Sequence, residues 1–264
     1  MSGAVAAGFG LIVIGDELLS GKRRDRHFAH LRGLLAERGL ELRWVRFISD
    51  EAALITRTLE ETFASGDVVF SCGGIGATPD DRTRECAAEA LGRALVAHPD
   101  GLALLESRFG APLEPPHRRN LVTFPAGASL IPNPVNQVPG FSVEDHYFMP
   151  GFPSMAWPMM AWVLDQHYAD WQAPDRLAEQ AIAVDGARES DVIPLLERFE
   201  RDHPRLRLSC LPSLRSGGFS LELGLRGAPA EVAAAMAALQ KAVSALGFAW
   251  QPVALGGEDE RHDD

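Results

Sequence analysis

The chain has 264 residues, of which 46% are hydrophobic and 23% charged, a composition typical of a globular protein with one large or two modest domains. Its formal net charge of -11 argues against a general nucleic-acid or membrane-surface binder, because such binding depends on an excess of Lys and Arg. Binding of a small anionic ligand is compatible with this charge, since a few local donors can overcome a negative mean field. The three cysteines are odd in number and widely separated, so neither a disulfide framework nor a zinc site is indicated, and we expect a reducing cytoplasm.

No membrane segment is expected near the start of the chain. The apolar run over residues 9–14 is far shorter than the roughly 20 residues that a membrane span needs. The residues before it lack the basic start and the long apolar core of a secretory signal.

The first half of the chain alternates strands and helices, which predicts an α/β sheet with right-handed crossovers. Asp50 stands where an N-cap is expected, ahead of the second helical pattern. The continuous apolar character of the first strand indicates cover on both faces, as in a parallel sheet. The elements expected in this half are strands at 10–14, 42–48 and 67–71 and helices at 26–38, 54–63 and 80–91.

The second half predicts a further, smaller domain. A helix is expected at 98–109, three short strands at 129–131, 141–143 and 147–149, and another helix at 154–167. We place the first domain at residues 1–170. Residues 176–255 follow the order β-α-β-β-α-β, which is typical of an α+β ferredoxin-like domain, with its central hairpin turn at Ser216 to Gly218. Residues 256–264 are expected to form an acidic tail.

The segment from Ser71 to Thr83 follows a buried strand and leads into a helix, and we interpret it as an anion site. Gly73, Gly74 and Gly76 allow backbone N-H groups to converge on a phosphate, and the dipole of the following helix adds to the attraction. The carboxyl end of a parallel strand is also where open α/β sheets bind ligands. The alternative is a tight turn in which Asp80 caps the helix.

Two acids in this segment, Asp80 and Asp81, would repel a phosphate unless a cation bridges them, and Mg²⁺ is the natural bridge. Alternatively, one of them caps the helix and the other is solvated. Thr78 and Thr83 are candidate hydroxyl donors to the phosphate. Asp16 follows the first strand, so it is expected at the same edge of the sheet, either bound to the ligand or the metal or lying in a plain turn.

Other charged side chains carry weaker signals. The basic run Lys22 to Arg24 either closes on a phosphate or forms a solvated face. The histidines show no metal-ligand spacing, and His27, His98 and His117 are interpreted as surface or helix-capping residues.

Four blocks in this order resemble the molybdopterin-binding domain of molybdenum-cofactor biosynthesis proteins, in the version found at the front of the competence/damage-inducible protein A family. Together they cover residues 8–167. The blocks are Ile14–Gly21 (IGDELLSG), Gly73–Thr83 (GGIGATPDDRT), Ile131–Pro134 (IPNP) with Pro139–Phe141 (PGF), and Met149–Pro153 (MPGFP) with Met155.

The resemblance implies a three-layer α/β/α domain that binds the pterin phosphate of molybdopterin, or a nucleotide pyrophosphate, at the glycine loop. It also implies that family members hydrolyse nucleotide pyrophosphates such as ADP-ribose with a divalent metal, and that they form homo-oligomers, here a dimer or trimer. The residues that match the phosphate site are Gly73, Gly74, Gly76, Thr78, Asp81 and Thr83, with Asp16 facing it; Ser71 precedes them, and Asp50 matches a family acid.

The chain departs from the family pattern at several positions. Where the family tends to carry Asp-x-Asn after the first block, this chain has Asp25, Arg26 and His27. Asn136 and Gln137 stand where a Gly-Thr pair is common, and the C-terminal amidohydrolase domain of longer members is not expected. Three functions are therefore open, namely a metal-dependent pyrophosphatase, a non-hydrolytic molybdopterin-binding protein, and an interaction scaffold with a vestigial cleft.

Overall fold

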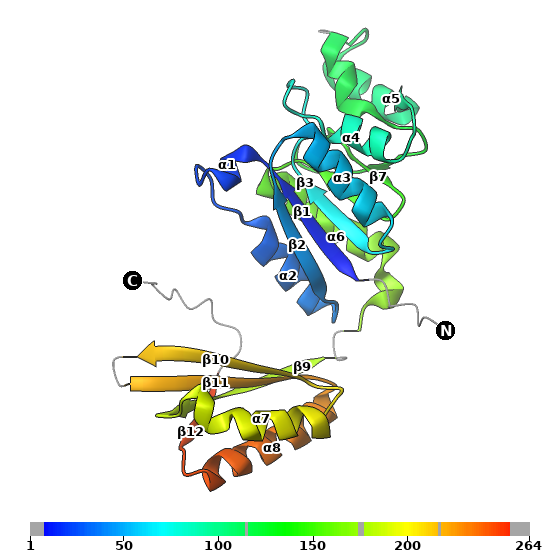
Figure 1. Ribbon diagram of the computed structural model, residues 1–264. Coiled ribbons are helices and arrows are strands. Elements are labelled where there is room, and N and C mark those ends of the chain that lie inside the picture. Colours follow the sequence, from blue (N-terminus) through cyan, green and yellow to red (C-terminus); the bar gives the residue numbers. More distant parts are fainter. Residues whose placement is uncertain (1–7, 114–115, 174–176, 216–217, 254–264) are drawn as a thin grey trace. The chain divides into compact units, whose positions relative to one another are not determined.

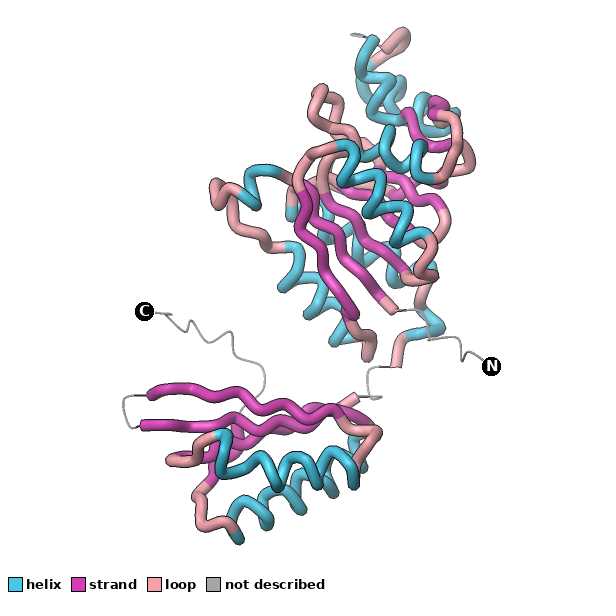
Figure 2. Tube along the Cα trace, viewed as in Figure 1, coloured by secondary structure: helices cyan, strands magenta, loops and turns pink. Residues whose placement is uncertain are grey.

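The computed structural model describes residues 8–113, 116–173, 177–215 and 218–253. The chain divides into two compact units, Met1–Gln172 and Ala173–Asp264, and each is described by itself (Figures 1 and 2). The sequence-based expectations for the turn residues Ser216 and Gly217 and for the acidic tail at 256–264 lie outside the described residues.

Unit 1 is built on a six-stranded sheet, which is mainly parallel as predicted. The pairs β1–β2, β1–β3 and β3–β8 are parallel, and the pairs β7–β8 and β6–β7 are antiparallel. All six residues of β1 are buried, which agrees with its continuous apolar sequence. In spatial order the strands are β2 (Leu42–Ile48), β1 (Phe9–Ile14), β3 (Val68–Cys72), β8 (His146–Met149), β7 (Gly140–Val143) and β6 (Ser129–Ile131).

Helices cover both faces of this sheet and complete three layers (Figure 1). Leu11 and its neighbours on one face pack against α2 (His27–Glu37) and α6 (Pro153–His167). Ile12 and its neighbours on the other face pack against α3 (Ala52–Phe63), α4 (Thr83–Ala90) and α5 (Pro99–Phe109). The alternation of side chains along each strand thus separates two apolar cores. The fold class expected from the sequence is confirmed.

Several local features differ from the expectations. Two short pieces are additional, the helix α1 (Asp16–Leu19) and the antiparallel pair β4 (Leu95–Ala97) and β5 (Thr123–Pro125). The 3-10 helices Pro116–Val122 and Ala169–Trp171 complete unit 1. The prediction of a helix at 80–91 is wrong about its start, because the corresponding helix α4 begins at Thr83 and the residues before it form turns.

The prediction that Asp50 caps α3 is also wrong. Glu51 occupies the cap position, and it makes no side-chain capping hydrogen bond. The Asp50 carboxylate instead accepts a hydrogen bond from the backbone N-H of Asp16 at 2.9 Å. His98, in contrast, caps α5 by accepting from the N-H of Gly101 at 3.4 Å, as the sequence suggested. The side chain of His117 lies outside the described part of the chain.

Unit 2 has the expected ferredoxin-like topology. Its antiparallel sheet has the strand order β10-β11-β9-β12, and the helices pack on one face of it around a single apolar core. The elements in chain order are β9 (Ala178–Asp185), α7 (Glu189–Asp202), β10 (Arg207–Arg215), β11 (Gly218–Gly227), α8 (Pro229–Ala245) and β12 (Trp250–Val253).

One buried histidine links the sheet of unit 1 to α3. His146 is 1% exposed, and its Nε2 lies 2.9 Å from Oγ1 of Thr62. The Thr62 hydroxyl donates to the carbonyl of Thr58, so Nε2 of His146 is the donor and Nδ1 carries the lone pair. Burial lowers the pKa of His146 to about 3.

Acid should therefore weaken unit 1 through this residue. The unfolded chain binds the proton below about pH 6.5, whereas the folded chain resists it down to about pH 3, so the stabilisation is complete above pH 6.5 and is lost as the pH falls through this window. We expect the free energy of unfolding to fall by about 1.4 kcal/mol per pH unit from this group alone. Denaturant titrations of the chain between pH 7 and pH 4, followed by tryptophan fluorescence, measure this slope.

The matched variant is His146→Gln, which keeps a donor for Thr62 and does not titrate. It should show a shallower slope than the wild type. Equal slopes in the wild type and in His146→Gln would contradict the assignment.

Candidate functional site

The glycine loop, residues 73–78, connects β3 to the turn before α4. A Cβ atom at Gly73 would overlap the carbonyl oxygen of Ile14 at the end of β1, and Gly73 has a φ of 111°. Gly74 has a φ of 67°, and a Cβ there would overlap Oγ1 of Thr83. Only glycine allows both the left-handed backbone and the close approach at these positions.

The loop is held from the first turn of α4. Thr83 has no exposed surface. Its hydroxyl donates to the carbonyl of Gly73 at 3.1 Å, and its backbone N-H donates to the carbonyl of Gly74 at 3.0 Å. The guanidinium of Arg84 is 3% exposed and donates to the carbonyl of Ile75 at 2.6 Å. Burial is the main cause that lowers the pKa of Arg84. Three successive carbonyl groups thus point toward α4 and are paired there.

Most N-H groups of the loop, in contrast to its carbonyl groups, have no hydrogen-bond partner among the described residues. Gly73 donates to the carbonyl of Met149 at 3.0 Å, but the four N-H groups of residues 74–77 have no acceptor in the described part of the chain. A run of unpaired backbone donors next to the N-terminus of an eight-residue helix is a binding arrangement for an anion. This run is the central feature of the site.

Asp81 is engaged within the loop. Its Oδ2 accepts from the N-H of Thr78 at 2.9 Å and also from the Thr78 hydroxyl, and Gly76 lies against the same carboxylate. Asp80 is exposed on the neighbouring turn. The two acids predicted to act together therefore differ, since one closes a turn and the other faces solvent.

A second group of acids meets at the ends of β1 and β2. The N-H of Asp16 donates to Oδ2 of Asp50 at 2.9 Å, and the N-H of Asp50 donates to Oδ1 of Asp16 at 3.4 Å. Burial raises the pKa of Asp50, and the negative charges of Asp16, Glu17 and Asp80 raise it further, against the Asp16 hydrogen bond. Asp50 thus joins Asp16 and Asp80 in one electrostatic neighbourhood, whereas the sequence indicated Asp50 only as a helix cap or as a match to a family acid.

Some predicted groups lie away from the loop surface. Ser71 has no exposed surface and its hydroxyl has no partner in the described residues, so it belongs to the core below the loop. Lys22, Arg23 and Arg24 are all exposed, as a solvated face would be. The described residues contain no cluster of three or more His, Cys, Asp or Glu side chains that could hold a metal ion.

A hollow of about 420 Å³ lies between the end of the loop at Ala77 and Thr78 and the side chains of α4. Carboxylates and guanidinium groups line it, together with the amide of Asn120. The charged and amide side chains that line it are Asp81, Arg82, Arg84, Glu85, Glu89 and Asn120. Because both signs of charge and an amide face it, the hollow suits a polar ring with donors and acceptors better than a second phosphate.

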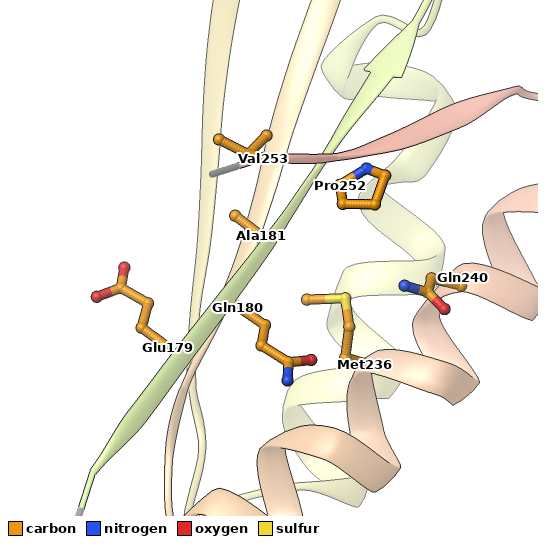
Figure 3. A pocket seen from close by; sticks show the side chains of 7 residues that line it. All are labelled: Glu179, Gln180, Ala181, Met236, Gln240, Pro252 and Val253. Carbon is orange, nitrogen blue, oxygen red and sulfur yellow. The ribbon is translucent and has the colours of Figure 1, made fainter. Parts of the chain in front are cut away.

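Unit 2 has a smaller hollow of about 230 Å³ between β9, β12 and α8. In Figure 3 the side chains of Gln180 and Met236 lie together between β9 and α8, and Glu179 lies apart from them. None of the seven residues that line this hollow is a cation. This hollow therefore offers no cationic side chain to an anion.

Comparison with known proteins gives one consistent family. Residues 10–169 match the family described as "Probable molybdopterin binding domain". A CinA-like protein of Geobacter sp. (strain M21) is 39% identical over 150 residues, which are 54% of this chain and 36% of that protein. A CinA-like protein of Geobacter metallireducens is 32% identical over 211 residues, or 75% of this chain and 50% of that protein. The chain thus spans about a third to a half of the length of these relatives.

A solved structure agrees with the fold of unit 1. The protein CinA from Thermoplasma acidophilum, whose function is described as unknown, is 27% identical with a TM-score of 0.54, and the match covers 62% of this chain and 98% of that one. No helix within the described ranges has the length and apolar character needed to cross a membrane.

The glycines of the loop provide a direct test of the geometry. Gly73→Ala places a methyl group against the Ile14 carbonyl on a left-handed backbone, and we expect the free energy of unfolding to fall by about 1–3 kcal/mol. Gly33→Ala in α2 is the control, because no atom lies within 4 Å of the added Cβ and helix propensity favours alanine by about 1 kcal/mol. Denaturant unfolding of both variants measures the contrast. Equal stabilities for the two variants would show that the loop is not constrained as described.

Proposed function

The chain belongs to the molybdopterin-binding domain family, and from this premise we propose that unit 1 binds a phosphorylated pterin or nucleotide at the glycine loop. The observation that supports this most is the run of four N-H groups at residues 74–77, which have no acceptor among the described residues and lie beside the N-terminus of α4. A phosphate that accepts from these groups also benefits from the helix dipole.

The loop is pre-organised for this role. Its carbonyl groups are already paired with Thr83 and Arg84, so the phosphate would not have to compete with them or reorder the backbone. Pre-organised donors lose little conformational entropy on binding. The heterocycle of the ligand would occupy the adjacent hollow, where Glu85, Glu89 and Asn120 offer acceptors and a donor for ring N-H and keto groups.

Thr83→Val tests this binding mode. The variant keeps the volume of the side chain but frees the Gly73 carbonyl, and loss of one such hydrogen bond should weaken phosphate-ligand binding by about tenfold. Titration calorimetry with AMP, GMP, ADP-ribose and inorganic phosphate measures the affinity. Thr123→Val is the matched control, since it removes a hydroxyl that bonds Arg119 away from the loop. Absence of binding for every phosphorylated probe to the wild type would refute the proposal.

Hydrolysis of the bound ligand is a second candidate, and the raised pKa of Asp50 favours it. The negative charges of Asp16, Glu17 and Asp80 contribute to the raised pKa of Asp50, and a divalent cation would relieve this repulsion. The fit is limited, because the described residues hold no three-ligand cluster and Asp81 is turned toward Thr78. Mg²⁺ is, however, commonly bound by one or two carboxylates together with phosphate oxygens.

In this candidate function Asp16 and Asp50 would hold the cation, and Asp80 would be a further carboxylate beside it. When bound, a divalent cation offsets the negative charge that develops on the phosphoryl oxygens and lowers the pKa of a bound water. The chain itself contributes the loop N-H groups, which hold the phosphate in place. Nucleotide pyrophosphates such as ADP-ribose are the substrates we propose, and cleavage would yield two phosphate monoesters.

Asp50→Asn distinguishes binding from hydrolysis. Asparagine keeps an oxygen for the Asp16 N-H but removes the charge, so the fold should be retained while metal-dependent turnover falls by at least tenfold. Incubation with ADP-ribose or FAD and Mg²⁺ or Co²⁺, followed by chromatography for AMP, measures turnover, and Asp100→Asn in α5 is the control. If the wild type binds the probes without forming a monoester, the non-hydrolytic molybdopterin-binding function replaces this one.

Oligomeric state and location are part of the same proposal. We propose that the chain forms a homodimer or homotrimer, on the basis of the family resemblance. We also propose that it is located in the cytoplasm, where the three cysteines, Cys72, Cys86 and Cys210, would stay reduced. If Asp81→Ala and Thr83→Val match the wild type in all ligand assays and in cells, the scaffold function with a vestigial cleft becomes the better description.

A further inference from the structure

The turn that follows β8 supports the glycine loop from below. Gly73 donates its N-H to the carbonyl of Met149 at 3.0 Å. Two residues later, a Cβ atom built on Gly151 would lie 3.5 Å from Cα of Gly73, an ordinary van der Waals distance. Gly151 therefore lies beside the first residue of the loop, separated from it by no more than the space of a methyl group, and the Met149 bond joins its turn to the loop.

His27 fixes this turn from the first residue of α2. Its side chain is 4% exposed, and its Nε2 lies 3.1 Å from the carbonyl oxygen of Gly151. Since a carbonyl can only accept, Nε2 is the donor and Nδ1 carries the lone pair. Asp25 holds the start of the helix by accepting from the N-H groups of His27 and Phe28, both at 3.0 Å. The sequence suggested a surface or capping role for His27, and the structure contradicts it.

We propose that His27 is a positioning residue for the glycine loop, which it holds through Gly151 in the geometry that exposes the N-H groups of residues 74–77. The site that it supports rests on the proposed function, but the contact with Gly151 does not. Neutral His27 maintains the loop, and protonated His27 loosens it.

The surroundings of His27 explain why its protonation matters. Nδ1 is buried and has no partner among the described residues, so a proton there has no acceptor. Burial is the largest cause that lowers the pKa of His27, while the Gly151 hydrogen bond and the Asp25 charge raise it. The other titratable groups nearby are His30 one turn along α2, whose ring stacks on Trp157 of α6 at 4.1 Å, and Cys72, whose thiol pKa is raised by burial and by Asp25.

Amide hydrogen exchange of the ligand-free chain tests the positioning role directly. The reporters are the N-H groups of Gly73 and Thr83, which are bonded to Met149 and Gly74, with Leu223 of unit 2 as the reference. His27→Ala should speed exchange at Gly73 and Thr83 by about tenfold, as expected for the loss of one hydrogen bond, and leave Leu223 unchanged. His27→Asn retains a donor for Gly151 and should restore slow exchange. His30→Asn is the control on the same helix.

The pH profile separates positioning from simple packing. After correction by the reference amide, exchange at Gly73 and Thr83 in the wild type should accelerate as the pH falls below 6.5, whereas His27→Asn should show no such change. AMP affinity measured by calorimetry over the same pH range should follow the exchange data. If His27→Ala leaves the two amides at wild-type rates, or if His27→Asn keeps the wild-type pH profile, the positioning role is overturned. If the exchange results hold but AMP does not bind to the wild type, the proposed function fails and the positioning role stands.

Discussion

The architecture of the site depends on one close approach, that of Gly73 to the carbonyl of Ile14. The ends of β1 and β3 meet there without an intervening side chain, and β8 adds the Met149 carbonyl from the other side. Any side chain at Gly73 would push the strand ends apart and turn the following N-H groups away from one another. The position of the loop donors follows from this constraint, and the bonds from Thr83 and Arg84 of α4 hold the loop in place.

The arrangement of charge around the loop has a consistent physical logic. Arg84 is buried and neutralises no carboxylate by direct contact in the described residues, so its role is to pair a loop carbonyl. The carboxylates lie at the rim, where Asp50 carries a raised pKa because burial and like charges disfavour its ionised form. A negatively charged chain can therefore present a local anion site, because the donors are backbone groups whose strength does not depend on net charge.

Much of this could be predicted from sequence. Apolar runs and helical periodicity located the layered sheet, the second unit and the glycine loop, because these features follow from burial and backbone freedom. The partners of Asp50 and His27 could not be predicted, because each bond depends on where the chain returns in space. Asp50 meets a residue 34 positions away, and His27 meets one 124 positions away. The start of α4 was misplaced because Asp80 and Asp81 have the composition of a cap, whereas Asp81 closes a turn with Thr78.

The loop and α4 have a consequence for how the chain folds. Thr83 reaches Gly73 over 10 residues, Arg84 reaches Ile75 over 9, and Asp81 reaches Thr78 over 3. Closing such short segments costs little chain entropy, and contacts of this kind form early in folding. The glycine loop and the start of α4 can therefore take shape as a local unit, onto which the more distant strands β1 and β8 later assemble. Substitutions at the rim and in the hollow can then change the site, while the twelve residues 73–84 keep the hydrogen bonds that hold the loop.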